Sequence, residues 1–123
     1  METSGPLHYR KSWRVNHKRS AEGGANLFYI VLRQNQTPRA QWREEVLAEH
    51  LEWARRSSDA GDLVLSGPAD DKKMGIYLLR APDVSAARAV AERDPVIAGG
   101  YCSYQLLDWD IQRGRALLET GHE

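Results

Sequence analysis

His50 is the first candidate for acid–base chemistry, because it is the one histidine in the middle of the chain and the three others lie near its ends. Trp42, Val46, His50 and Trp53 stand at positions i, i+4, i+8 and i+11, so a helix places all four on one face. An imidazole titrates near neutral pH, and a half-buried histidine beside two indoles can take up and return protons. The alternative is a histidine that only packs against the tryptophans. The residues alone leave both interpretations open.

Asp94 is a carboxylate that could orient this histidine. Asp94-Pro95 closes a predicted helix, and its carboxylate reaches His50 if both predicted helices pack on the same face of the sheet. An aspartate before a proline also ends helices without any chemistry, so a structural alternative stands here too. Further side chains are predicted to bind substrate, through a hydroxyl, a guanidinium or aromatic rings. They are Ser66, Arg33, Trp42, Trp53 and Tyr29.

The elements that position these residues follow from the apolar pattern. Short apolar runs predict strands and spacings of three and four residues predict helices. The predicted strands cover residues 27–32, 63–66, 74–80 and 101–108, and the predicted helices cover residues 39–60, 84–93 and 111–119. In the first helix, Leu47, Leu51 and Ala54 are predicted to pack on the sheet, and Gly67-Pro68 is predicted to end the second strand in a turn. The order is that of a ferredoxin-like α+β fold with a four-stranded antiparallel sheet.

An open sheet with helices on one face leaves its other face partly apolar, and that face must be covered. The usual cover is a second copy of the same chain. We therefore expect a homodimer or a higher homo-oligomer.

The charge of the chain is balanced overall but not along its length. The 17 basic and 17 acidic residues cancel, which argues against a dedicated nucleic-acid-binding protein. Residues 1–25 carry five basic and two acidic side chains, whereas residues 26–123 carry 12 and 15, so the net charges are +3 and −3. We interpret residues 1–25 as a basic extension that lies on the acidic domain or on a partner subunit, or is disordered. A nucleic-acid-binding arm is the less favoured alternative.

The sequence lacks the patterns that characterise several classes of protein. No apolar run approaches the roughly 20 residues that span a bilayer, and the polar N-terminus lacks the apolar segment of a secretory signal. Cys102 is the only cysteine, so no intrachain disulfide can form. We expect a cytoplasmic protein that does not contact membranes. No His, Cys, Asp or Glu spacing matches a metal site and no Gly-rich phosphate loop follows a strand, so neither a metal nor another cofactor is predicted.

Three short motifs in order resemble the YCII family of the dimeric α-β barrel superfamily. They are His50-Leu51, the run Gly61-Asp62-Leu63-Val64-Leu65-Ser66-Gly67-Pro68, and Asp94-Pro95 ahead of a glycine-rich turn. The resemblance extends from Leu27 to Trp109 and implies a pocket by the dimer interface with a paired histidine and aspartate, which correspond to His50 and Asp94. It divides the chain into a basic extension (1–25), a YCII-like domain (26–110) and a C-terminal helical tail (111–123).

The resemblance also implies a class of activity. Relatives include a dehydrochlorinase of a chlorinated hydroxyhydroquinone and cofactor-independent isomerases of lactones. We therefore expect a cofactor-independent lyase or isomerase that acts on a small cyclic or aromatic molecule, with His50 as acid and base and Asp94 as its orienter. Two alternatives remain: a cofactor-less oxygenase of an activated phenol or quinol, and a non-catalytic dimeric module that binds a small molecule.

Overall fold

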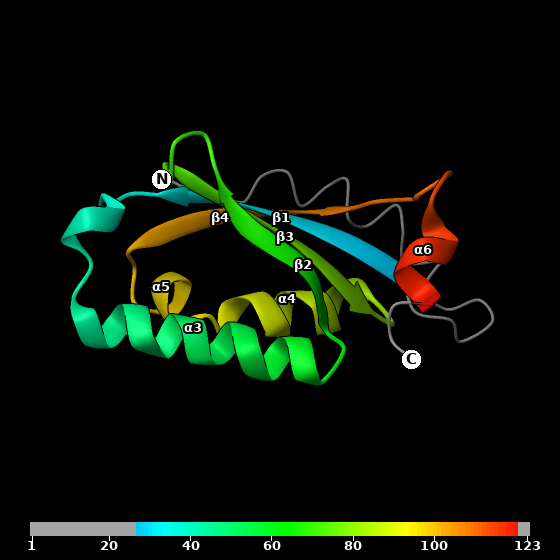
Figure 1. Cartoon of the computed structure of the whole chain (residues 1–123), viewed down its shortest axis with the longest axis horizontal. Coiled ribbons are helices and arrows are strands. Elements are labelled where there is room, and N and C mark those ends of the chain that lie inside the picture. The colour runs from blue at the N-terminus through cyan, green and yellow to red at the C-terminus, as the bar shows by residue number, and fades with distance from the viewer. Residues whose placement is uncertain (1–26, 121–123) are drawn as a thin grey trace.

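A four-stranded antiparallel sheet with helices on one face makes up the described part of the chain, residues 27–120 of the computed structural model (Figure 1). The elements are β1 (Leu27–Asn35), the 3-10 helix η1 (Arg39–Gln41), α3 (Glu44–Asp59), β2 (Leu63–Ala69), β3 (Met74–Ala81), α4 (Val84–Glu92), α5 (Pro95–Ala98), β4 (Cys102–Asp108) and α6 (Arg115–Thr120). The strand order is β2-β3-β1-β4. The predicted α+β class, ferredoxin-like order and antiparallel sheet are confirmed.

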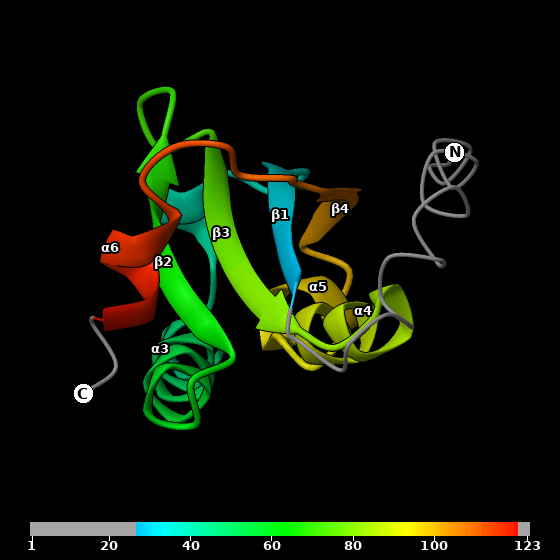
Figure 2. The ribbon, with the colours of Figure 1, turned by 90° about the vertical axis from the view of Figure 1, so that its right-hand side faces the viewer.

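The helices divide the covered face of the sheet between them. Seen along the strands, α3 lies beneath β2, and α4 and α5 lie beneath the other half of the sheet (Figure 2). Side chains alternate across the pleat, so every second residue of β1 and β3 faces these helices. This face forms the main core, whose most buried members include Tyr29, Val31, Leu79, Ala87 and Leu106. The core thus holds α3 and α5 at fixed positions under the sheet.

The first long helix is shorter than predicted. Residues 39–41 form the separate turn η1, Trp42 and Arg43 are extended, and α3 begins only at Glu44. The Trp42 backbone N–H closes η1 on the Arg39 carbonyl and its indole N–H donates to the Thr37 carbonyl at 3.0 Å. These two bonds hold the tryptophan outside the helix. Trp42 therefore reaches His50 from a linker and not from a shared helical face.

The face of α3 that packs on the sheet also differs from the prediction. Leu51 is 54% exposed, so its predicted place against the sheet is wrong. The buried residues of α3 are Trp53 and Ser57. The indole fills the space under the sheet and donates a hydrogen bond to the Val90 carbonyl of α4 at 3.2 Å. The helix is thereby turned so that Leu51 lies at the wall of an open pocket and stays largely exposed.

The second strand continues through the predicted turn. β2 includes Gly67 and Pro68, which pair with residues of β3, and ends at Ala69. Because β2 is the edge strand, the missing N–H of proline costs no ladder bond on its open side. The actual turn follows at Asp70, Asp71 and Lys72, which all adopt left-handed backbone angles. A register irregularity between Leu63 and Leu65 precedes Ser66 and sets it opposite Tyr77.

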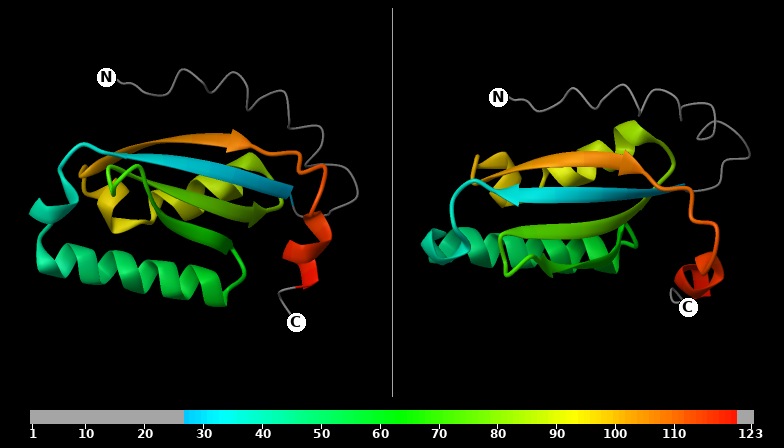
Figure 3. Two further views of the ribbon diagram at one scale, coloured as in Figure 1. Left: turned by 45° about the horizontal axis from the view of Figure 1, so that its top comes forward. Right: turned by 90° about the horizontal axis from the view of Figure 1, so that it is seen from above.

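The C-terminal elements also differ in detail from the prediction. The expected loop after Asp94 contains the short helix α5, and the terminal helix begins at Arg115 instead of residue 111. Figure 3 shows α6 at one end of the sheet, away from α3, α4 and α5. In residues 27–120, no helix has the length and apolar character needed to cross a membrane. The predicted basic extension, residues 1–25, lies outside the described residues.

Candidate functional site

His50 and Asp94 come from different helices and meet under the sheet. His50 lies in the middle of α3, and Asp94 is the N-cap residue of α5. The His50 Nδ1 and Asp94 Oδ1 atoms are 2.8 Å apart; the carboxylate side chain is 0% exposed and the imidazole side chain 12%. An ionised carboxylate only accepts hydrogen bonds, so Nδ1 carries the hydrogen in this pair. The lone pair of the neutral imidazole is then on Nε2, the nitrogen that a base uses.

The Asp94 carboxylate is held by two further donors. The Val96 backbone N–H donates to Oδ1 at 3.2 Å, and the Tyr77 hydroxyl donates to Oδ2. Arg33 Nη1 in turn donates to the Tyr77 oxygen at 2.9 Å. Burial raises the pKa of the Tyr77 phenol far above its usual value and the charge of Asp94 raises it further, against the opposing effect of Arg33. Tyr77 therefore stays a neutral donor that fixes the orientation of the carboxylate.

Two tryptophans fix the imidazole ring. Trp53 stacks on His50 with ring centroids 6.0 Å apart and planes inclined by 23°. Trp42 contacts the same ring edge-on, at 5.9 Å and 76°. Both indoles are themselves held by hydrogen bonds from their ring N–H groups to backbone carbonyls. The histidine is consequently confined on two sides and oriented by a third, which leaves it little freedom to rotate.

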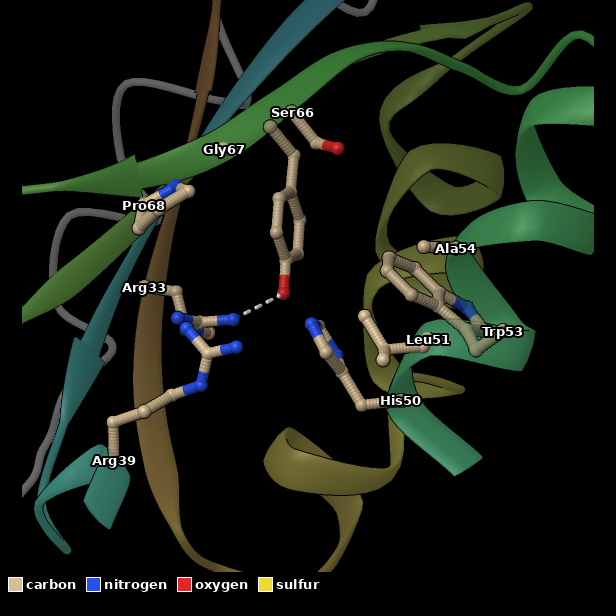
Figure 4. Close-up of a pocket in the computed structure, with 10 residues that line it drawn as sticks. Arg33, Arg39, His50, Leu51, Trp53, Ala54, Ser66, Gly67 and Pro68 are labelled. Atoms are coloured by element: carbon tan, nitrogen blue, oxygen red, sulfur yellow. Dashed lines mark hydrogen bonds between the residues drawn. The ribbon is translucent and has the colours of Figure 1, made fainter. Parts of the chain in front are cut away.

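A pocket of about 210 Å³ opens beside His50, between α3 and the edge strand β2. Figure 4 shows His50 and the two arginines on different sides of the same space. Its polar walls carry His50, Ser66, Tyr77, Arg33 and Arg39, and its apolar walls carry Leu51, Trp53, Ala54 and Pro68. The arrangement offers a base, a hydroxyl, two guanidinium groups and an apolar surface to a small molecule.

Comparison with known proteins identifies the family of the chain. Residues 27–110 match the model of the YCII-related domain, and this span covers well over half of the chain. The chain belongs to the YCII-related family. A search among curated proteins finds no match.

In this YCII-related domain the sequence-predicted residues take three kinds of position. Those that line the pocket are His50, Ser66, Trp53 and Arg33. Asp94 and Trp42 lie behind the pocket, in contact with His50. Tyr29 is 1% exposed, belongs to the main core and does not line this pocket. It faces the helices like Arg33 but lies earlier on β1, opposite Leu79 of β3.

The sequence does not predict two residues of the YCII-related site, Arg39 and Gly75, and it suggests Tyr77 only as one of several tyrosines that could line a pocket. In the sequence, Tyr77 is an ordinary aromatic residue of an apolar strand. Its hydrogen bond to Asp94 depends on the packing of α5 under β3. Arg39 reads as part of the first helix, whereas the 3-10 turn directs it into the pocket. The alternation of side chains along the strand places Tyr77 on the same face as Leu79, toward the helices. This alternation does not distinguish a site residue from a core residue.

Gly75 makes room for the Arg33 side chain. The two residues are register partners on β3 and β1. A Cβ atom at Gly75 would lie 2.7 Å from Arg33 Cζ and 2.7 Å from Nη2. The absence of a side chain thus allows the guanidinium to lie across β3 and reach the Tyr77 hydroxyl.

The one cysteine of the YCII-related domain packs behind the site and does not line the pocket. Cys102 is 5% exposed and its thiol donates to Asn35 Oδ1 at 3.3 Å. Burial raises the pKa of this thiol to about 12, so it is a poor nucleophile at neutral pH. Within residues 27–120, no three His, Cys, Asp or Glu side chains gather in a way that could hold a metal ion. The expected independence from cofactors stays a prediction.

Proposed function

We propose that this YCII-related protein is a cofactor-independent lyase or isomerase that transfers a proton on a small cyclic or aromatic molecule. The observation that supports this proposal is the contact of 2.8 Å between His50 Nδ1 and Asp94 Oδ1 at the wall of a pocket. A fully buried carboxylate that orients a histidine is the base-and-orienter arrangement of acid–base catalysis.

The proposed reaction begins when Nε2 of His50 removes a proton from a carbon or hydroxyl group of the substrate. The positive charge that forms on the imidazole is stabilised by Asp94 through Nδ1–H. The electron pair released on the substrate then expels a leaving group on the neighbouring atom, which is elimination. Alternatively it shifts a double bond and His50 returns the proton at another atom, which is isomerisation. Ser66 can donate a hydrogen bond to a substrate oxygen in either case.

Isotope exchange across a panel of ring compounds tests this proposal. The protein is incubated in D2O with single-ring lactones, enolisable cyclic ketones and halogenated hydroquinones, and mass spectrometry detects deuterium uptake or loss of halide. We expect His50→Gln to lower the observed rate by about 100-fold or more, because the substitution removes the base and preserves side-chain size. The control is Glu49→Gln, which changes an exposed neighbour on the same helix.

The outcome of this experiment separates the alternatives. A His50→Gln protein that keeps the full rate contradicts the assigned role. Oxygen uptake by a phenol or quinol of the panel, measured with an oxygen electrode, supports the cofactor-less oxygenase instead. A His50→Gln protein that does not fold, judged by circular dichroism, favours a histidine that only packs in a non-catalytic binding module.

We also propose that the protein is a homodimer in which the open faces of two sheets pack together. A groove of about 300 Å³ on this face contains Ile30, Leu65, Ile76, Leu78 and Trp109. Leu65 is 59% and Trp109 46% exposed. The element α6 covers only the end of this face, where it packs near Phe28. Isolated apolar side chains are common on surfaces, whereas a contiguous apolar groove is typical of an interface.

A charge on the open face is expected to separate the proposed dimer. Leu65→Glu places a carboxylate in an apolar interface. The free energy needed to desolvate this charge exceeds the free energy gained from the apolar contacts between the subunits. We expect the wild-type protein to sediment as a dimer and this variant as a folded monomer in analytical ultracentrifugation. The control Ala89→Glu, on the exposed side of α4, should sediment like the wild type. A wild-type protein that is monomeric at micromolar concentration would contradict the proposal.

A further inference from the structure

Two guanidinium groups stand at one end of the pocket. Arg33 enters from β1 and Arg39 from the turn η1, and both line the pocket beside His50. Each Cζ atom lies 5.3 Å from the centroid of the Trp42 ring. Figure 4 shows both guanidinium groups at the border of the space that His50 also faces.

Arg33 is a buried cation without a carboxylate partner in the described part of the chain. It is 3% exposed, and its guanidinium donates a hydrogen bond to the neutral Tyr77 hydroxyl. Its Nε atom is buried with no hydrogen-bond partner among residues 27–120. Burial of a charge is costly unless an opposite charge accompanies it. Asp94 does not fulfil this role directly, because Tyr77 stands between the two side chains.

Arg39 adds a second uncompensated positive charge. Among the residues that the structure describes, its side chain forms no ion pair and no hydrogen bond, and its contact is with the Trp42 ring. The described residues that line the pocket include no acidic side chain. The two guanidinium groups therefore present donors and positive charge to whatever occupies the pocket, and its walls supply no carboxylate to accept from them.

The rest of the pocket restricts the size and nature of the occupant. Its volume of about 210 Å³ is below the roughly 300–1,000 Å³ of sites for drug-sized ligands. The wall opposite the arginines is apolar and includes Leu51, Trp53 and Ala54. A single flat ring suits this wall, and a planar carboxylate suits the fork of a guanidinium group.

We propose that the pocket binds a single-ring carboxylate, whose anionic group lies between Arg33 and Arg39 and whose ring lies against the apolar wall of α3. This assignment rests on the proposed function, since it names the substrate class of the same site. The carboxylate is the anchor and does not react. It holds the ring so that an atom next to the anchored group faces Nε2 of His50, and the arginines act as substrate-binding residues, while His50 is the catalytic residue.

The test compares a charged probe with a neutral probe of the same shape. Benzoate and benzamide are titrated into ¹⁵N-labelled full-length protein, and backbone amide shifts of residues around the pocket, such as Ser66 and Gly67, report binding. We expect benzoate to shift these signals and benzamide to bind at least about tenfold more weakly, because charge-assisted hydrogen bonds to the guanidinium groups are lost. Salicylate and 4-hydroxybenzoate extend the panel of carboxylates.

Arg39→Gln is the informative variant, because Arg33 also holds Tyr77 in the core. We expect this substitution to weaken benzoate binding by about tenfold or more and to leave benzamide binding unchanged. Arg56→Gln removes the same charge from the exposed side of α3, outside this pocket, and should leave benzoate binding unchanged. A uniform effect of both variants would show non-specific attraction and overturn the proposal.

Other results overturn the proposal just as directly. They are equal binding of benzamide and benzoate, benzoate binding that does not depend on Arg39, and no shift of pocket signals by any of the three carboxylates at millimolar concentration. The failure of the catalytic proposal is distinguishable, because His50→Gln should still bind benzoate. If that variant binds benzoate and also keeps full turnover, the result supports the proposed anion site and contradicts the catalytic role of His50.

Discussion

Replacement of Asp94 by alanine is expected to lower the free energy of unfolding by about 3 kcal/mol, because it removes the partner of several buried groups at once. The carboxylate is 0% exposed and accepts hydrogen bonds from His50, the Tyr77 hydroxyl and the Val96 N–H. Without it, the Tyr77 hydroxyl loses its acceptor and the buried Arg33 guanidinium loses the negative charge beyond it. Urea unfolding followed by tryptophan fluorescence measures the loss.

Asp83 provides the matched control for this prediction. It is also an N-cap aspartate, and its side chain accepts a hydrogen bond from the Ala86 N–H at 2.9 Å. Loss of such a cap costs about 1 kcal/mol, so Asp83→Ala isolates the capping contribution. The excess loss in Asp94→Ala, about 2 kcal/mol, measures the contacts with His50 and Tyr77. Equal losses in the two variants would show that Asp94 acts only as a helix cap.

Gly75→Ala is expected to destabilise the protein by about 2 kcal/mol, because the new methyl group overlaps the Arg33 side chain. The Cβ atom would lie 2.7 Å from Arg33 Cζ. The guanidinium cannot simply move away, since it is bonded to Tyr77 and lies over the rings of Trp42 and Tyr77. We expect the same variant to bind benzoate more weakly than the wild type. Thermal unfolding and the amide-shift titration measure the two effects.

The control for Gly75 is another strand glycine at the same site. Apart from Gly67 itself and its two chain neighbours, no atom of the described residues lies within 4 Å of a Cβ built at Gly67. Gly67→Ala should therefore change the free energy of unfolding by no more than about 0.5 kcal/mol. In an Arg33→Ala background the overlap is gone, so Gly75→Ala should then cost little, and the double-mutant cycle isolates the coupling between the two residues. A similar cost in both backgrounds would contradict the steric explanation.

Much of the fold could be predicted because it depends on local patterns. Apolar runs and helical spacings located all four strands and both main helices, and their order sufficed for the ferredoxin-like class. The errors arose where tertiary contacts override local preference. Pro68 reads as a strand breaker, yet an edge position tolerates it. Leu51 reads as a core residue, yet the larger Trp53 occupies the space under the sheet.

The candidate site was predictable only in part for the same reason. His50 and Asp94 carry their own signals, namely an unusual residue on an aromatic helical face and an aspartate at a helix boundary. Arg39 and Gly75 carry none, since each is an ordinary residue in its own element, and Tyr77 carries only a strand alternation that core residues share. Their importance comes from neighbours that are distant in the sequence.

The sequence by itself therefore determined the fold class and the family resemblance, and it singled out His50 and Asp94 as a candidate pair, because these depend on spacing along one chain. Only the tertiary structure decided that Asp94 touches His50, that Tyr77 links it to Arg33, and that two arginines face one pocket. The register of β1 against β3 sets Arg33 over Gly75, and the packing of α3 and α5 under the sheet sets His50 beside Asp94. Such relations arise from pairing and burial over the whole domain, which no local pattern contains.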